Sequence, residues 1–127
     1  MPEKPSLAGR AYLVVEDEYP VALHLCSELQ DVGASVLGPV SNVEGALDFL
    51  TGEHMPDAAI LDIKLRGTMG YAVADRLLDI GLPFVFVTGY DCTSIPDRFR
   101  SVPCLTKPCE DRTLISHLAG LSCDAPQ

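Results

Sequence analysis

Short apolar runs alternate with helix-like segments along the whole chain, and this alternation restricts the fold more than any other feature. Each apolar run is short enough for a buried strand, and the runs lie at 11–15, 34–40, 58–61, 84–87 and 104–106. Strands that alternate with helices in this way predict a parallel sheet with helices on both faces. A length of 127 residues fits one such domain.

The segments between the runs carry apolar residues at intervals of three and four, which is typical of helices packed on one side. They cover 18–32, 43–50, 73–80 and 114–121. Gly33 and Gly81 follow two of them and suit helix carboxyl ends. The remaining segment, 91–99, contains Thr93 and Pro96, so we expect a short or irregular helix there.

We expect a domain over 10–121, with tails at 1–9 and 122–127. No apolar run approaches the roughly 20 residues of a membrane span, and the first residues lack the apolar stretch of a signal peptide. These features predict a cytoplasmic protein that does not bind membranes.

The formal net charge is -9, which opposes binding to phosphate backbones and predicts no nucleic-acid partner. The acidic surface serves solubility, or some carboxylates cluster around a cation; the two explanations are compatible.

Five cysteines, an odd number, make a disulfide framework improbable in a cytosolic chain. Cys104 and Cys109 lie close in sequence without a second ligand pair, so a zinc site is the weaker alternative to packed or surface thiols. His24, His54 and His117 occur singly, as surface or packing histidines do.

In parallel sheets of this kind, ligands bind beyond the carboxyl ends of the strands. Four of the five predicted strands end in groups that carry chemistry: Glu16, Asp17 and Glu18; Asp62; Thr88 and Gly89; and Lys107 and Pro108. The remaining strand is followed by the turn residues Ser41 and Asn42. Each signal alone is weak, because such residues often cap helices or form turns. Their joint occurrence at strand ends predicts a site.

The carboxylates of Glu16, Asp17 and Asp62 would repel one another at this edge of the sheet. A bound hard cation such as Mg²⁺ commonly offsets such repulsion. A carboxylate nucleophile, a magnesium ion, an ammonium and a hydroxyl donor are the parts needed to transfer a phosphoryl group. One of these carboxylates would be the nucleophile, with Lys107 and Thr88 contacting the phosphoryl oxygens. Gly89 leaves the site open to solvent and partners.

Four blocks of sequence, VVEDE at 14–18, ILDIKL at 60–65, VTGY at 87–90 and LTKP at 105–108, resemble the signature blocks of response-regulator receiver domains. The resemblance covers about 10–121 and implies a flavodoxin-like sheet with its five strands in the order 2-1-3-4-5. It implies Asp62 as phosphoacceptor, Thr88 as switch hydroxyl and Lys107 as the phosphoryl-contacting lysine. For the metal it implies Mg²⁺ held by Glu16, Asp17, Asp62 and the main-chain carbonyl of Lys64, with Glu16 acting through water. A cis bond between Lys107 and Pro108 follows from the same likeness.

The family resemblance also implies a sensor histidine kinase or phosphotransfer protein as donor, and an output through protein contacts. The chain would catalyse only its own phosphorylation and dephosphorylation and is not a conventional enzyme. Relay of phosphate, draining of a kinase and regulation of a partner all stay open. PFVFVTGY at 83–90 resembles a subgroup of single-domain receivers, some of which act in general stress signalling.

One departure from the family is Cys104, which stands where receivers usually have the aromatic switch residue. We therefore expect phosphorylation to pull Thr88 toward Asp62 and to reorder the segment 89–99. Within this segment, Tyr90 is either an aromatic that moves in place of the missing one or a residue that packs on the surface.

Two other functions compete with this prediction. A phosphorylation-independent interaction module of the same fold is disfavoured by the intact set Asp17, Asp62, Thr88 and Lys107. A small phosphohydrolase or nucleotide or flavin binder is disfavoured because no glycine-rich phosphate loop follows the first strand and Lys64 stands where a second aspartate would be.

Overall fold

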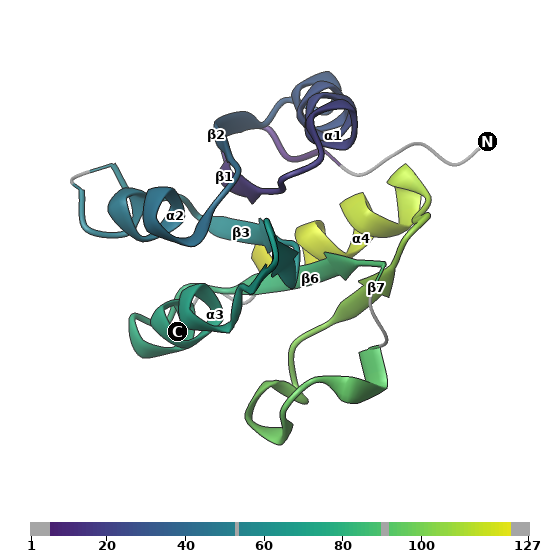
Figure 1. The fold of residues 1–127 in the computed structure, drawn as a ribbon. Helices are drawn as coiled ribbons and strands as arrows, with labels where there is room; N and C mark the ends of the chain where they lie inside the picture. Colours follow the sequence, from purple (N-terminus) through teal and green to yellow (C-terminus); the bar gives the residue numbers. More distant parts are fainter. Residues whose placement is uncertain (1–5, 53, 90–91, 123–127) are drawn as a thin grey trace.

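The fold is a sheet between two layers of helices (Figure 1). The computed structural model describes residues 6–52, 54–89 and 92–122. Its strands are β1 (Ala11–Val15), β2 (Ser35–Val40), β3 (Ala58–Leu61), β4 (Lys64–Leu65), β5 (Thr68–Met69), β6 (Phe84–Thr88) and β7 (Cys104–Thr106). Its helices are α1 (Tyr19–Asp31), α2 (Val43–Phe49), α3 (Tyr71–Asp79) and α4 (Asp111–Ser122), with the 3₁₀ turns η1 (Cys92–Ser94) and η2 (Asp97–Phe99).

The main sheet has the order β2-β1-β3-β6-β7, and every neighbouring pair in it is parallel. This is the predicted flavodoxin-like order, because β4 and β5 leave the sheet to form a separate antiparallel hairpin. The hairpin was not predicted, since each of its strands is only two residues long. It follows β3 directly and lies at the sheet edge where the site was expected.

Alternate residues of the strands enter two separate cores, one on each face of the sheet. Leu13, Leu61 and Phe86 lie in the core covered by α2 and α3. Val14, Ile60 and Val85 lie in the core covered by α1 and α4. The helices occupy these two sides of the sheet in Figure 1, so the prediction of helices on both faces is confirmed.

The packed part of the chain begins before the expected boundary at residue 10. Leu7 lies within the expected tail, yet it is fully buried in the core beneath α1, and its N–H donates to the carbonyl of Val32 at 2.9 Å. A single leucine carries no periodicity, so the sequence pattern did not reveal this contact.

Where the structure describes the segment between β6 and β7, from residue 92 on, it forms two short 3₁₀ turns instead of a regular helix, which confirms the expectation of a short or irregular helix. Phe99 anchors η2 in the core and stacks on Tyr71 with ring centroids 5.6 Å apart. Arg98 forms a two-pronged hydrogen bond with Asp75 of α3, at 2.7 and 3.1 Å. Tyr90 lies outside the described residues.

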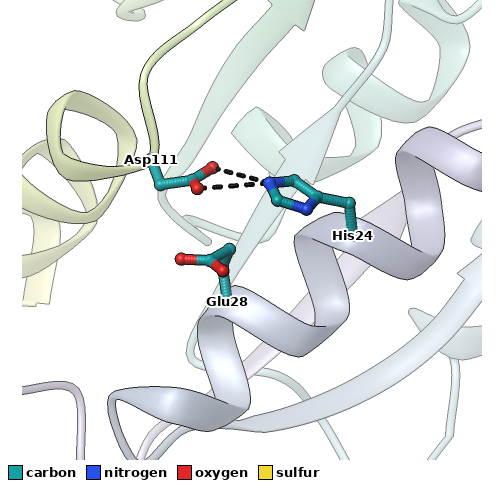
Figure 2. Close-up of side chains that lie close together, drawn as sticks. All are labelled: His24, Glu28 and Asp111. Carbon is teal, nitrogen blue, oxygen red and sulfur yellow. Dashed lines mark hydrogen bonds and ion pairs between the residues drawn. The ribbon is translucent and has the colours of Figure 1, made fainter.

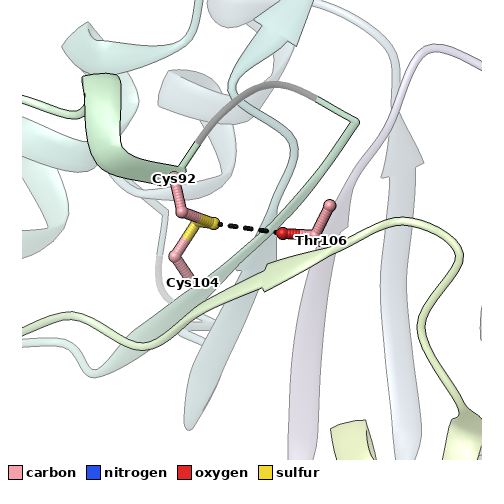
Figure 3. The surroundings of a disulfide bond; sticks show 3 residues. All are labelled: Cys92, Cys104 and Thr106. Atoms are coloured by element: carbon pink, nitrogen blue, oxygen red, sulfur yellow. Dashed lines mark hydrogen bonds between the residues drawn. A yellow bond between two sulfur atoms is a disulfide. The ribbon is translucent and has the colours of Figure 1, made fainter.

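The sequence made a disulfide framework improbable, but one pair of cysteines does form a disulfide. Cys92 of η1 and Cys104 of β7 are joined by a disulfide with their Cα atoms 6.0 Å apart (Figure 3). The two cysteines are 12 positions apart in sequence, and the return of the chain from η1 through η2 into β7 brings them together. Cys26 and Cys109 are free thiols.

Candidate functional site

The carboxyl ends of β1, β3 and β6 bring three polar side chains into the protein interior. Glu16 is 5% exposed, Asp62 is 6% exposed and Thr88 is 1% exposed. They are the buried polar or charged residues among those that the structure describes. Backbone bonds fix two of them, because the N–H of Asp62 donates to the carbonyl of Val15 and that of Glu16 to the carbonyl of Val40, each at 2.9 Å. Buried carboxylates are costly unless they are paired, which marks this edge as the candidate site.

Lys107 supplies the cation that these carboxylates need. Its Nζ lies 2.7 Å from Oε1 of Glu16 and 3.1 Å from Oδ2 of Asp62. A third contact, 3.1 Å to Oε1 of Glu18, lies at the exposed rim. The backbone N–H of Lys107 donates to the carbonyl of Thr88 at 2.8 Å. Its bond to Pro108 is cis, as the resemblance implied.

Protonation at the site reflects burial and these contacts. Desolvation raises the pKa of Glu16 to about 7, although hydrogen bonds from Lys107 and from the N–H of Glu18 act in the opposite direction. Desolvation opposes the charge of Lys107, but the hydrogen bonds and charges of Glu16 and Asp62 outweigh it and raise the pKa of the lysine. Lys107 is therefore a permanent cation at neutral pH.

Asp17 is held beside the site by the hairpin that follows Asp62. Its Oδ2 accepts a hydrogen bond of 2.9 Å from the N–H of Arg66. Arg66 and Gly67 have φ values of 50° and 81° and form the two-residue turn between β4 and β5. A turn of this kind needs positive φ at both positions, which Gly67 adopts at no steric cost.

Gly70 closes the hairpin against the end of β3. An added Cβ there would lie 3.0 Å from the carbonyl oxygen of Asp62, so a side chain would push against the backbone of Asp62 itself. The hairpin, with Arg66 and Gly70, is thus part of the site, and the sequence did not reveal it because the elements are too short to give a periodic signal.

A cavity of about 350 Å³ opens beside Asp62 and gathers the predicted residues. Its lining comprises Asp17, Glu18, Asp62, Lys64, Gly67, Thr88, Gly89 and Lys107. Carboxylate oxygens of Glu16, Asp17 and Asp62 all lie within 4.8 Å of one another. Such an oxygen-rich set, with two of its three members buried, fits a hard divalent cation such as Mg²⁺. The structure thus unites the predicted site residues and adds Glu18, whose carboxylate lines the cavity and contacts Lys107.

A second cavity, of about 590 Å³, runs from Asp62 and Lys107 between α1 and α4. Its walls include Val21, Val87 and Leu114. At its rim, Nε2 of His24 lies 3.2 Å from both carboxylate oxygens of Asp111, with Glu28 one turn further along α1 (Figure 2). His24 is a surface residue, as predicted, and its contact with Asp111 joins α1 to α4.

Known proteins were compared with the chain as a sequence and as a structure. No family model matches the sequence, and no curated protein does. Among solved structures, SdrG from Sphingomonas melonis Fr1 is 38% identical, with a TM-score of 0.77 over 88% of this chain and 95% of SdrG. A response regulator receiver protein from Sinorhizobium medicae WSM419 is 27% identical, with a TM-score of 0.77 over 94% of this chain and 98% of the other. The chain belongs to the response-regulator receiver family.

The likeness extends to another receiver domain at the level of the fold. The receiver domain of the PhyR response regulator from Erythrobacter litoralis is 22% identical and has a TM-score of 0.80, over 95% of this chain and 97% of the other. The present chain keeps the receiver fold, although it has no regular helix between β6 and β7 among the residues described. Within the same residues, none of its helices has the length and apolar character to cross a membrane.

Proposed function

We propose that this receiver accepts a phosphoryl group on Asp62 and reports its phosphorylation state to partner proteins. The observation that carries the proposal is the buried Asp62 carboxylate, whose Oδ2 lies 3.1 Å from the Lys107 ammonium at the edge of a cavity. Asp17 and Glu16 supply the neighbouring carboxylates. A solved structure of SdrG carries the description "BeF3-activated", which supports the same activation chemistry for this chain.

The reaction follows from the positions of the chain's own groups. A carboxylate oxygen of Asp62 attacks phosphorus, and the bond from phosphorus to the histidine nitrogen of the donor breaks. Lys107, already at hydrogen-bond distance from Asp62, neutralises charge on the transferred oxygens. Thr88 lines the same cavity and donates its hydroxyl to one of these oxygens. Asp17, Asp62, Glu16 and the carbonyl of Lys64 would hold Mg²⁺, which would supply further charge neutralisation when bound.

The donor would be a phosphohistidine on a sensor kinase or phosphotransfer protein, which must approach the open side of the site. Tyr19, Val21 and Leu23 of α1 are large apolar side chains that remain exposed, and Val21 lines the cavity that leads to Asp62. Exposed apolar residues beside an active group support a protein contact there. The motif at 83–90 supports a role in general stress signalling.

Mass spectrometry after treatment with acetyl phosphate and Mg²⁺ tests the acceptor. The wild type is expected to gain one phosphoryl group, mapped to Asp62, and Asp62→Asn to gain none. Asp79→Asn is the matched control, because Asp79 is an exposed carboxylate of α3 far along the chain from the site. Labelling of Asp62→Asn at the wild-type rate would remove Asp62 as the acceptor. A wild type that takes up no phosphoryl group would favour the phosphorylation-independent module.

A further inference from the structure

The disulfide between Cys92 and Cys104 ties the 3₁₀ turn η1 to β7, the edge strand of the sheet (Figure 3). It closes a covalent ring around η1 and η2, because Cys92 begins η1 and Cys104 begins β7. Cys104 is paired with Phe86 in the sheet. Both cysteines are only half-buried.

This covalent tie lies beside the strand ends that carry the phosphoryl site. Sγ of Cys92 is 3.5 Å from Oγ1 of Thr106, and Thr106 pairs with Thr88 across the sheet. The residue after Thr106 is Lys107, whose N–H donates to the carbonyl of Thr88 at 2.8 Å. The phosphoryl site and the disulfide are therefore joined through Thr106 and its sheet partner Thr88.

The segment has further anchors, but they lie toward its other end. Phe99 is buried against Phe86 and Tyr71, and Arg98 is hydrogen-bonded to Asp75. Reduction of the disulfide therefore releases the end of the segment nearest to the phosphoryl site and leaves the Phe99 end in place. A local release of this kind changes the freedom of one segment without unfolding the domain.

We propose that Cys92 and Cys104 are a reversible redox modification site that controls how readily Asp62 is phosphorylated, by restraining the η1–η2 segment, residues 92–99. The regulation rests on the proposed phosphoacceptor function. The disulfide restrains the segment and slows phosphorylation of Asp62, whereas the dithiol form allows faster phosphorylation. The reactant class is a low-molecular-weight disulfide such as oxidised glutathione, with the corresponding thiol acting in the reverse direction.

The exchange balances in two steps. The thiolate of one cysteine attacks the small disulfide, forms a mixed disulfide and expels one small thiolate. The thiolate of the second cysteine then attacks the protein sulfur of the mixed disulfide and expels the other. The two cysteines lose two electrons, the small disulfide gains them, and the two cysteine protons end on the two released thiols.

The two free cysteines of the described chain are natural internal controls. Burial raises the pKa of the Cys26 thiol, and burial together with the charges of Asp111 and Glu110 raises that of Cys109. A higher pKa leaves less thiolate, which is the reactive form. Modification is therefore expected to be slow at Cys26 and Cys109, whereas Cys92 and Cys104 already lie within bonding distance of each other.

Equilibration in glutathione buffers of increasing oxidising strength, followed by thiol trapping and peptide mass spectrometry, tests the site itself. Cys92 and Cys104 are expected to oxidise together to one cross-linked peptide pair in the wild type, in Asp62→Asn and in the control Cys109→Ser. Absence of this pair in oxidising buffer, or equal cross-linking among the other cysteines, would overturn the assignment. Because Asp62→Asn accepts no phosphoryl group, this arm is independent of the proposed function.

Amide exchange and melting of the two redox forms test the restraint. Opening the ring is expected to speed exchange in 92–99 about ten-fold and to lower the melting temperature by about 10 °C, since a cross-link of this ring size limits the freedom of the unfolded chain. Cys92→Ser and, separately, Cys104→Ser are expected to match the reduced wild type in either buffer. Equal exchange in 92–99 for both redox forms would contradict the restraint.

The coupling is tested by acetyl phosphate labelling of Asp62 in the two redox forms, with Mg²⁺ present. The reduced protein is expected to be labelled several-fold faster than the oxidised one, and Cys92→Ser at the reduced rate in both buffers. Equal rates for the two wild-type forms would overturn the regulation while leaving the acceptor intact. No labelling in either form would overturn the proposed function instead.

Discussion

Oδ2 of Asp62 lies 3.1 Å from Nζ of Lys107, and the same ammonium lies 2.7 Å from Oε1 of Glu16. One lysine therefore pairs with two buried carboxylates that follow different strands. The arrangement places the cation of the site against the proposed nucleophile before any phosphoryl group arrives, so Lys107 serves both the stability of the fold and the proposed chemistry.

Lys107→Met is expected to destabilise the metal-free protein by about 3 kcal/mol at neutral pH, because it leaves buried carboxylates without a cation. The loss should shrink at about pH 5, below the raised pKa of Glu16 of about 7, because that carboxyl group is then protonated and needs no cation. Urea unfolding at both pH values measures this. Arg112→Met, which removes an exposed cation of α4, is the control. Equal stability of Lys107→Met and wild type at neutral pH would refute the role.

Mg²⁺ is expected to raise the melting temperature of the wild type and to have little effect on Asp17→Asn. Asparagine keeps an oxygen that accepts the hydrogen bond from Arg66 but removes the charge. At a free concentration ten times Kd, binding to the folded state alone adds about 1.4 kcal/mol. Asp57→Asn is the matched control for Asp17→Asn. Asp57 also accepts a hydrogen bond from a backbone N–H, that of Ala11, but it is not among the proposed metal ligands. A Mg²⁺ shift as large in Asp17→Asn as in the wild type would exclude Asp17 as a ligand.

Phe99→Ala is expected to cost about 3–5 kcal/mol, although it lies in an irregular segment, because a buried aromatic leaves a cavity when truncated. Phe99 is 1% exposed and packs on Phe86 and Tyr71. Leu78→Ala, at a leucine that is 43% exposed, should change stability far less. Chemical denaturation compares the two variants. A Phe99→Ala protein that unfolds at the wild-type midpoint would show that η2 is not anchored in the core.

The pair Asp75–Arg98 is expected to contribute a small, salt-sensitive coupling that disappears in acid. The hydrogen bond from Arg98 lowers the pKa of Asp75, so the contribution is present above the ordinary aspartate range, near pH 4, and is lost as pH falls through the lowered pKa. Arg98 also lies 4.5 Å from the centre of the Phe99 ring, so a single Arg98 variant would lose that contact as well. A double-mutant cycle with Asp75→Asn and Arg98→Gln therefore isolates the coupling between Asp75 and Arg98. A coupling that persists unchanged in strong acid would show that charge is not its origin.

The sequence by itself determined the parallel sheet and the residues at its carboxyl edge. Apolar runs such as 58–61 and 84–87 carry a strand signal that does not depend on distant contacts. Once these runs are strands of one parallel sheet, their carboxyl ends must meet. Asp62, Thr88 and Lys107 therefore come together from chain order alone, as the shared cavity shows.

Tertiary structure decided what depends on close approach between short or isolated elements. The hairpin that presents Arg66 to Asp17 has strands of two residues, too short to leave a pattern. Leu7 is buried only because α1 and the loop before β2 surround it. Cys92 meets Cys104 because two 3₁₀ turns return the chain to the sheet edge. Periodicity reports which face of an element is apolar, whereas these contacts depend on where the chain turns in space, and that is set by packing of the complete fold.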